Sequence, residues 1–375
     1  MKTIMFVFGT RPEAIKMAPV IMEMNKRPHQ FKTIVCLTGQ HREMIRSFVE
    51  YFSISVDFDL EVMREGQSLA EMTSRLIRKL EPIVREKKPD VILVQGDTTS
   101  ALAGAMVGYY NDIRVAHVEA GLRTNNKRAP FPEEINRRLI GTIADFHFAP
   151  TELAAAALLR ENMPAERVLV TGNTVIDALL ATADQVDGLP EIESLARLAH
   201  DDSKMLLITG HRRENFGQGF ENICAAIKKL ALAFPATHFV YSVHLNPNVQ
   251  GPVFSWLSDL PNVHLIPPQG YMDFVRLLKR STLVLTDSGG IQEEAPSLGK
   301  PVLIMRDVTE RMEAVSVGAA VLVGTEVERI FSVASRLLTD EAEYHRMSHA
   351  GNPFGDGKSS QRICDFLDVA SLQSS

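Results

Sequence analysis

Short apolar runs rich in β-branched residues alternate with longer amphipathic segments from end to end of this sequence. Most runs have four to six residues and are apolar throughout, which is typical of strands buried on both faces of a parallel sheet. They occupy residues 4–8, 33–37, 91–94, 115–118 and 168–170 in the first half, and 205–209, 238–243, 264–266, 283–286, 302–305 and 321–323 in the second. The alternation predicts βαβ units, with helices on both faces of parallel sheets.

One segment shows the helical pattern clearly. Its apolar residues recur at three- and four-residue spacing between residues 68 and 86. Ser68 and Glu71 form the spacing of a capping box at its start, and Pro82 is expected to kink or shorten the helix.

The alternation weakens between residues 181 and 203, where acidic residues gather with Gly188 and Pro190. A length of 375 residues is typical of a chain with two domains. We therefore expect an α/β protein with a Rossmann-like domain over 1–180, a linker region over 181–203 and a second Rossmann-like domain over 204–360. The final helical pattern, within 361–375, either completes the second domain or packs back on the first.

Charge and cysteine content narrow the classes of partner. The net charge is −6, so no general basic field attracts nucleic acid or a lipid surface. No apolar run approaches 18 residues, and the run at 4–8 is too short for a signal-peptide core. Cys36, Cys224 and Cys364 are far apart and lack metal-ligand spacing. We expect a cytoplasmic protein with no membrane span, no disulfide framework and no metal site.

Small and charged residues follow five of the predicted strands. In parallel sheets, ligands bind beyond the carboxyl ends of the strands. The five loops begin at Gly9, Gly96, Glu119, Gly210 and Asp287. Their coincidence at the same end of successive strands predicts an active site between the two domains.

Two of these loops could bind an anion. The turn from Gly9 to Arg11 precedes a helix, whose free N–H groups favour negative charge, although an ordinary tight turn with a surface arginine fits equally. Asp287-Ser288-Gly289-Gly290 could place backbone N–H groups against a diphosphate, with Glu293 or Glu294 accepting ribose hydroxyls. The alternative for this loop is a capping residue followed by acidic residues that serve the helix dipole.

The remaining loops carry titratable groups. His211 with Arg212 and Arg213 combines an acid–base side chain with two phosphate-binding ones, unless all three are solvated surface residues. Asp97, Glu119 and the pair Glu133-Glu134 could act as general acids and bases, although any one of them taken alone fits a helix cap or a surface residue better. No dinucleotide fingerprint is present, so NAD chemistry is not expected, and His117-Val118-Glu119 lacks the P-C-x-x-C partner of zinc deaminases.

Four motifs indicate a protein family, which the alternation of strands and helices does not. They are residues 9–16 (GTRPEAIK), 117–123 (HVEAGLR), 210–214 (GHRRE) and 286–295 (TDSGGIQEEA). In this order the chain resembles the non-hydrolysing bacterial UDP-N-acetylglucosamine 2-epimerases, from residue 8 to about residue 357. The resemblance implies a glycosyltransferase-B fold, in which two Rossmann-like domains face a cleft. It also implies cytoplasmic interconversion of UDP-GlcNAc and UDP-ManNAc for capsule and other cell-surface polysaccharides, by a homodimer without a cofactor.

The resemblance assigns roles residue by residue. It implies proton transfers at C2 of the sugar by Asp97, Glu119 and Glu133, with no assignment to either face, and stabilisation of the departing diphosphate by His211. It implies substrate-binding residues at Arg11, Lys16, Gln269, Phe274, Ser288, Gly289, Gly290, Glu294 and Arg311. Some family members have a second, activating UDP-GlcNAc site, whose residues match Gln40, Gln67, Arg212 and His244.

The sequence departs from the family pattern in two places. Gly66 stands where some relatives have a basic residue, which bears on activation, and Met312 replaces a proline after Arg311, which makes that loop less rigid.

Three other functions remain open. A glycosyltransferase of the same fold would share the nucleotide-binding loops, a hydrolysing epimerase would release free ManNAc, and a non-catalytic sensor would only bind the nucleotide sugar. The three carboxylates favour proton chemistry over transfer or sensing.

Overall fold

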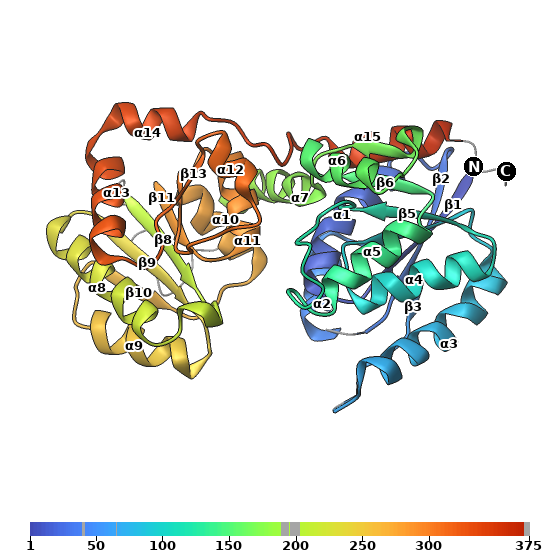
Figure 1. Ribbon diagram of the computed structural model, residues 1–375, viewed down its shortest axis with the longest axis horizontal. Helices are drawn as coiled ribbons and strands as arrows, with labels where there is room; N and C mark the ends of the chain where they lie inside the picture. The colour runs from blue at the N-terminus through green and yellow to red at the C-terminus, as the bar shows by residue number, and fades with distance from the viewer. Residues whose placement is uncertain (40–41, 65, 189–194, 196–202, 371–375) are drawn as a thin grey trace. The chain divides into compact units, whose positions relative to one another are not determined.

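The computed structural model describes residues 1–39, 42–64, 66–188, 195 and 203–370. The chain forms two compact units, one of Met1–Ala178 with Phe354–Ser375 and one of Leu179–Pro353 (Figure 1). The first division falls inside α7 (Thr174–Ala183). Of the expected linker 181–203, residues 189–194 and 196–202 lie outside the described residues, and residues 181–188 belong to the second unit. Residues 354–360, expected in the second domain, belong to the first unit.

The first unit is built on a seven-stranded parallel sheet in the order β3-β2-β1-β4-β5-β6-β7. Its strands are β1 (Lys2–Phe8), β2 (Phe31–Leu37), β3 (Phe58–Asp59), β4 (Val91–Gln95), β5 (Arg114–Val118), β6 (Phe146–Ala149) and β7 (Val168–Val170). The order reverses at β1 and β4, as in a doubly wound sheet, and this confirms the predicted fold class. The short β3 and the histidine-containing β6 escaped the sequence pattern.

Helices cover both faces of this sheet. They are α1 (Arg11–Asn25), α2 (Arg42–Tyr51), α3 (Leu69–Lys87), α4 (Thr99–Tyr110), α5 (Glu133–Ile143), α6 (Glu152–Arg160), the part of α7 up to Ala178 and α15 (Ser359–Val369). Ser68 and Glu71 form the predicted capping box of α3, with Ser68 N–H donating to Glu71 Oε2 over 2.8 Å. Pro82 does not shorten the helix, because α3 continues past it to Lys87.

The last helix lies against the first unit (Figure 1, red beside blue and green). Lys2 Nζ donates to the carbonyls of Leu367 and Asp368, each over 2.7 Å. The ring of Phe366 packs edge-on against Phe146 and Phe148, with centroids 5.5 and 5.6 Å away. Of the two placements left open by the sequence, α15 therefore takes the one on the first domain.

The second unit repeats the plan with a six-stranded parallel sheet in the order β10-β9-β8-β11-β12-β13. Its strands are β8 (Met205–Gly210), β9 (His238–Val243), β10 (Val263–Ile266), β11 (Leu283–Thr286), β12 (Val302–Ile304) and β13 (Ala320–Leu322). Its helices include α8 (Gln218–Ala233), α9 (Pro247–Leu257), α10 (Tyr271–Arg280), α11 (Gly289–Glu294), α12 (Met312–Ser316), α13 (Val327–Thr339) and α14 (Glu341–Ser348). All six strands were predicted, since each is short, largely apolar and contains β-branched residues.

Within the described residues, no helix has the length and apolar character needed to cross a membrane.

Candidate active site

The turn after β1 closes around a buried carboxylate. Glu13, in the first turn of α1, accepts hydrogen bonds from the N–H groups of Gly9 (3.0 Å) and Thr10 (2.7 Å) and from Thr98 Oγ1 (2.5 Å). Burial raises the pKa of Glu13, and these hydrogen bonds oppose the rise. Arg11 starts α1, and its guanidinium makes no hydrogen bond or ion pair with any described residue. The turn is therefore rigid at Glu13 and leaves the arginine available for a ligand.

Asp97 follows β4 and is held by two residues of α5. Its carboxylate accepts hydrogen bonds from Arg137 Nη2 (2.6 Å) and Nε (3.1 Å), and its carbonyl accepts one from Asn136 Nδ2 (2.9 Å). Burial raises the pKa of Asp97; Arg137 opposes the rise, and the charge of Glu119 adds to it. A carboxyl group shifted upward in this way is better suited to exchange protons near neutral pH.

Glu119 follows the neighbouring strand β5 in a left-handed conformation, with φ of 63°. Its carboxylate forms an ion pair of 2.5 Å with Lys16 Nζ and accepts a hydrogen bond from Gln95 Nε2. Both side chains of the ion pair are largely shielded from water, at 16% exposure for Lys16 and 6% for Glu119. Lys16, expected to contact substrate, thus lies beside an expected catalytic carboxylate.

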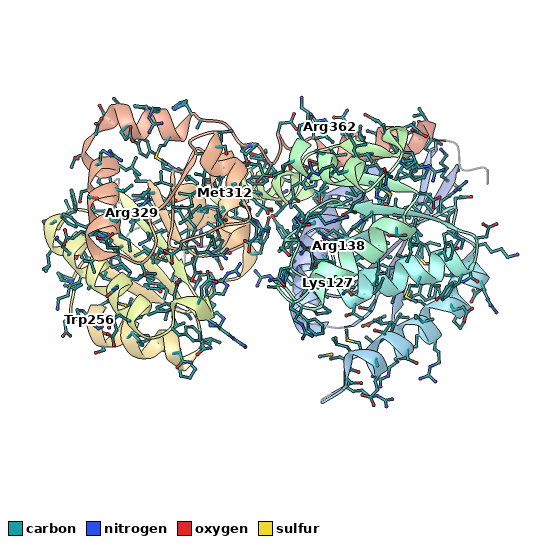
Figure 2. The ribbon with its side chains drawn as sticks, viewed as in Figure 1. Lys127, Arg138, Trp256, Met312, Arg329 and Arg362 are labelled. Carbon is teal, nitrogen blue, oxygen red and sulfur yellow. The ribbon has the colours of Figure 1, made fainter. Side chains whose placement is uncertain are left out.

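Glu133 and Glu134 begin α5 and have different surroundings. Glu133 Oε2 is buried and has no hydrogen-bond partner among the described residues. Glu134 is fully buried and accepts hydrogen bonds from the N–H groups of Thr124 (2.9 Å) and Asn125 (3.1 Å) and from Arg138 Nε (3.1 Å; Arg138 is labelled in Figure 2). Glu134 therefore stabilises the loop before α5, whereas Glu133 has a buried carboxylate oxygen that accepts no hydrogen bond from a described residue.

In the second unit, Asp287 ties the loop after β8 to the loop after β11. Its Oδ2 accepts hydrogen bonds from the N–H groups of His211 and Arg212, both over 2.9 Å, and its Oδ1 lies 3.2 Å from His211 Nδ1. Burial alone would raise the pKa of Asp287, but the contacts with His211 and Arg212 bring it below its ordinary value. The alternative interpretation of this loop was a helix cap, but Asp287 instead positions the histidine loop, and no side chain caps α11.

Arg311 lies over the start of α11. A Cβ added to Gly289 would stand 3.0 Å from the Arg311 Cζ, so a side chain at residue 289 would press on the arginine in this position. Arg311 Nε donates to Glu293 Oε1 over 2.8 Å, and no side chain caps α11. The N–H of Ser288 donates a hydrogen bond to Thr286 Oγ1. The Ser288 hydroxyl is left for a ligand. Met312, labelled in Figure 2, begins α12 directly after Arg311.

The other expected substrate residues of this unit lie on α11, on α10 and in the loop after β10. Glu294, at the end of α11, is half-buried, in contrast to the buried Glu293. Gln269 Nε2 donates to Pro267 O over 2.6 Å in the loop after β10, and Phe274 lies half-buried in the first turns of α10.

The residues matched to an activating site are spread over both units. His244 stacks on the His211 ring with centroids 5.6 Å apart, and Arg212 Nε is buried without a hydrogen-bond partner among the described residues. Gln67, in the first unit, accepts a hydrogen bond from Arg75 over 2.5 Å. Gln40 lies outside the described residues.

The expected residues are divided between the two units and follow strands of their sheets. The first unit holds Arg11, Lys16, Asp97, Glu119 and Glu133, and the second holds His211, Gln269, Phe274, Ser288, Gly289, Gly290, Glu294 and Arg311. Within the described ranges, no three histidine, cysteine or acidic side chains gather in an arrangement that could hold a metal ion.

Sequence reasoning missed four residues that hold the site: Glu13, Gln95, Asn136 and Arg137. A signal existed for the last two, which follow Glu133 at three- and four-residue spacing and so share its side of a helix.

Several known proteins are similar to this chain over nearly its whole length. A family model described as UDP-N-acetylglucosamine 2-epimerase matches residues 22–368. A UDP-N-acetylglucosamine 2-epimerase of Yersinia pestis is 53% identical over 97% of this chain and 98% of its own length, and that of Escherichia coli K12 is 52% identical over the same shares. The structure of UDP-GlcNAc 2-epimerase from Neisseria meningitidis bound to UDP-GlcNAc superposes with a TM-score of 0.87 at 46% identity, over 97% of this chain and 99% of that one.

Proposed function

The chain belongs to the UDP-N-acetylglucosamine 2-epimerase family, which confirms the resemblance inferred from its motifs, and we propose that it interconverts UDP-GlcNAc and UDP-ManNAc. One observation within the chain carries this proposal. Two carboxylates, Asp97 and Glu119, follow neighbouring strands and interact electrostatically, with Lys16 bonded to one and Arg137 to the other. Such a set suits the movement of protons on and off a carbon. The 46%-identical relative from Neisseria meningitidis, solved with UDP-GlcNAc bound, supports the choice of substrate.

Inversion at C2 needs a way to release an unactivated hydrogen. C2 is not next to a carbonyl, so direct removal of the proton would leave an unstabilised carbanion. If the C1–O bond breaks as the proton leaves, the C–H electron pair becomes the C1=C2 double bond, and UDP departs with the C–O pair. Return of a proton to the other face, with re-addition of UDP, gives the epimer. This route is elimination to 2-acetamidoglucal and UDP, and it requires exclusion of water.

The carboxylates of the first unit would carry the protons. We assign Asp97, Glu119 and Glu133 to the proton transfers at C2. Burial raises the pKa of Asp97, and Glu133 offers a buried oxygen that no described residue engages. Lys16 would hold Glu119 in place and contact the sugar.

The second unit would hold UDP. His211, whose Nδ1 faces Asp287, has Nε2 left to stabilise the departing diphosphate. Arg311 of this unit, together with Arg11 of the first, would clamp the diphosphate, because a guanidinium binds phosphate oxygens in pairs. Ser288, Gly289 and Gly290 would also bind the diphosphate. Glu294 would accept hydrogen bonds from the ribose hydroxyls, and Gln269 and Phe274 would bind uracil.

Two further properties are part of the proposal. UDP-GlcNAc would also activate the enzyme at a second site that includes Gln40, Gln67, Arg212 and His244. The enzyme would work as a cytoplasmic homodimer that supplies ManNAc units for capsule or other surface polysaccharide. Light scattering coupled to size-exclusion chromatography should give twice the 41.6 kDa mass of the chain; a mass of one chain would contradict the dimer.

Incubation with UDP-GlcNAc alone in D2O, followed by NMR, tests the reaction. The proposal predicts UDP-ManNAc with deuterium at C2. An epimer that keeps its C2 hydrogen would exclude the elimination route. Free ManNAc with UDP would indicate a hydrolysing enzyme, and an unchanged substrate would point to a transferase awaiting its acceptor or to a sensor.

A further inference from the structure

Two buried histidines lie side by side in the first unit, and the proposed chemistry uses neither. His117 on β5 is in register with His147 on β6, and each is 1% exposed. Burial lowers the pKa of His117 to about 3 and that of His147 to about 4. Both rings are therefore neutral near physiological pH, and neither is suited to carry a proton in the reaction.

The two rings differ in their hydrogen bonds. His117 Nε2 lies 2.7 Å from the carbonyl oxygen of Gly96. Because a carbonyl oxygen only accepts, the neutral ring carries its hydrogen on Nε2 and donates it to Gly96. Neither ring nitrogen of His147 is bonded to a described residue. The neighbouring strand thus provides an equally buried histidine without this contact.

The carbonyl that His117 holds belongs to the peptide that leads into Asp97. Gly96 is left-handed, with φ of 68°, and its N–H donates to Val118 O over 3.0 Å. Both its N–H and its carbonyl are therefore fixed to β5. On the other side of Asp97, the Thr98 hydroxyl donates to the buried Glu13. The backbone is thus held immediately before and immediately after the candidate catalytic carboxylate.

We propose that His117 is a positioning residue, which orients the Gly96–Asp97 peptide and so directs the Asp97 carboxylate toward C2 of the sugar. The proposal rests on the epimerase function given above, with Asp97 as a proton carrier. Glycine adopts many backbone conformations at little cost, so the peptide after Gly96 would rotate readily without this hydrogen bond. A displacement of about 1 Å at a reacting group can cost roughly a hundredfold in rate.

Three variants separate positioning from simple packing. His117→Leu removes the hydrogen bond, and His117→Gln keeps an N–H donor near the position of Nε2. His147→Leu is the matched control, because it empties an equally buried histidine site without loss of a hydrogen bond to the described protein. For each variant and the wild type, kcat and KM for UDP-GlcNAc, the affinity for UDP and Tm would be measured.

The expected result is a fall in kcat of roughly tenfold or more in His117→Leu, with KM and UDP affinity within about threefold of wild type. His117→Gln should recover most of this loss, and His147→Leu should keep a kcat within about threefold of wild type, even if its Tm falls.

Equal losses of kcat in His117→Leu and His147→Leu would overturn the proposal, as would an unchanged kcat in His117→Leu. If His117→Leu does not fold, His117→Gln decides: a kcat near wild type supports positioning, and a low kcat or a failure to fold contradicts it. A wild type that fails to epimerise in D2O would overturn the proposed function and this role with it. An active wild type with any of the contradicting variant results would overturn the role alone.

Discussion

The Lys16 ammonium and the Glu119 carboxylate form an ion pair of 2.5 Å that joins α1 to the residue after β5. Gln95 donates to the same carboxylate oxygen. Glu119 therefore has a fixed direction and a cation beside it before any substrate is bound.

Lys16→Met should reduce kcat for UDP-GlcNAc by about tenfold or more, because Glu119 loses the charge that orients and stabilises it. Lys26→Met is the control, since Lys26 forms an exposed ion pair with Glu23 at the other end of α1. Steady-state kinetics of both variants would check this, and a similar small effect in both would contradict the role of Lys16.

Substitution of Glu133 should mainly reduce activity, and substitution of the adjacent Glu134 should mainly reduce stability. Glu133→Gln should cut turnover by about a hundredfold while UDP affinity stays nearly unchanged, as expected for a group that moves a proton. Glu134→Gln should instead lower the free energy of unfolding by about 1–3 kcal/mol, because a carboxamide cannot accept all the hydrogen bonds that Glu134 accepts. Kinetics, calorimetry with UDP and urea denaturation would test the pair. Near-normal turnover of Glu133→Gln would return that residue to a structural role.

The stabilising effect of Glu134 should depend on pH. Burial alone would raise the pKa of this carboxyl, but hydrogen bonds from Thr124 and Arg138 bring it below the ordinary value of 4.5. A lowered pKa in the folded state gives stability that is fully present above the ordinary value and is lost as the pH falls through the lowered one. The difference in unfolding free energy between wild type and Glu134→Gln should therefore be constant from pH 7 to about 5.5 and shrink below pH 4.5. Urea denaturation at several pH values measures it, and a difference that does not change at low pH would contradict the assignment.

Asp287→Ala should weaken UDP binding by about tenfold or more, because the N–H groups of His211 and Arg212 lose their common acceptor. Stability should fall by about 1–3 kcal/mol for the same reason. Asp273→Ala, which breaks an ion pair with Arg276 on α10, should change stability by less than about 1 kcal/mol. Unchanged UDP affinity in Asp287→Ala would show that the loop keeps its shape without the carboxylate.

Gly289→Ala should also weaken UDP binding, by about tenfold, with little change in stability. The new methyl group meets the mobile end of the Arg311 side chain, which can move away from α11 but then leaves the proposed diphosphate site. Gly251→Ala is the control, since a Cβ there meets no atom within 4 Å. Titration calorimetry with UDP distinguishes the two, and equal affinities would argue against a clamp at Arg311.

Most of the architecture could be predicted because buried parallel strands leave a direct mark on the sequence. The six strands of the second unit and five of the seven in the first are short, largely apolar segments that contain β-branched residues, and a histidine in β5 or β10 does not hide the pattern. β6 was missed because it contains no β-branched residue, and β3 because two residues carry no pattern. The destination of α15 could not be predicted, since it depends on contacts with strands more than 200 residues earlier in the chain.

Prediction of the site was uneven for a related reason. Residues that follow a strand could be placed at its carboxyl end from the sequence alone, as with Asp97 and Glu119. Glu13 and Arg137 act across gaps of 85 and 40 positions to Thr98 and Asp97, and although helical spacing places Arg137 near Glu133, it does not report these long-range contacts.

The first unit consists of residues 1–178 and 354–375, so its last helix leaves the ribosome only after the whole second unit has been made. At about 5–20 residues per second, the growing chain spends roughly 10–35 s with the first unit incomplete. During that interval the rings of Phe146 and Phe148 lack the cover of Phe366, and Lys2 lacks its carbonyl partners. Co-translational folding of the first unit therefore ends with the docking of a C-terminal segment, and premature termination before residue 354 yields a chain with an open apolar surface.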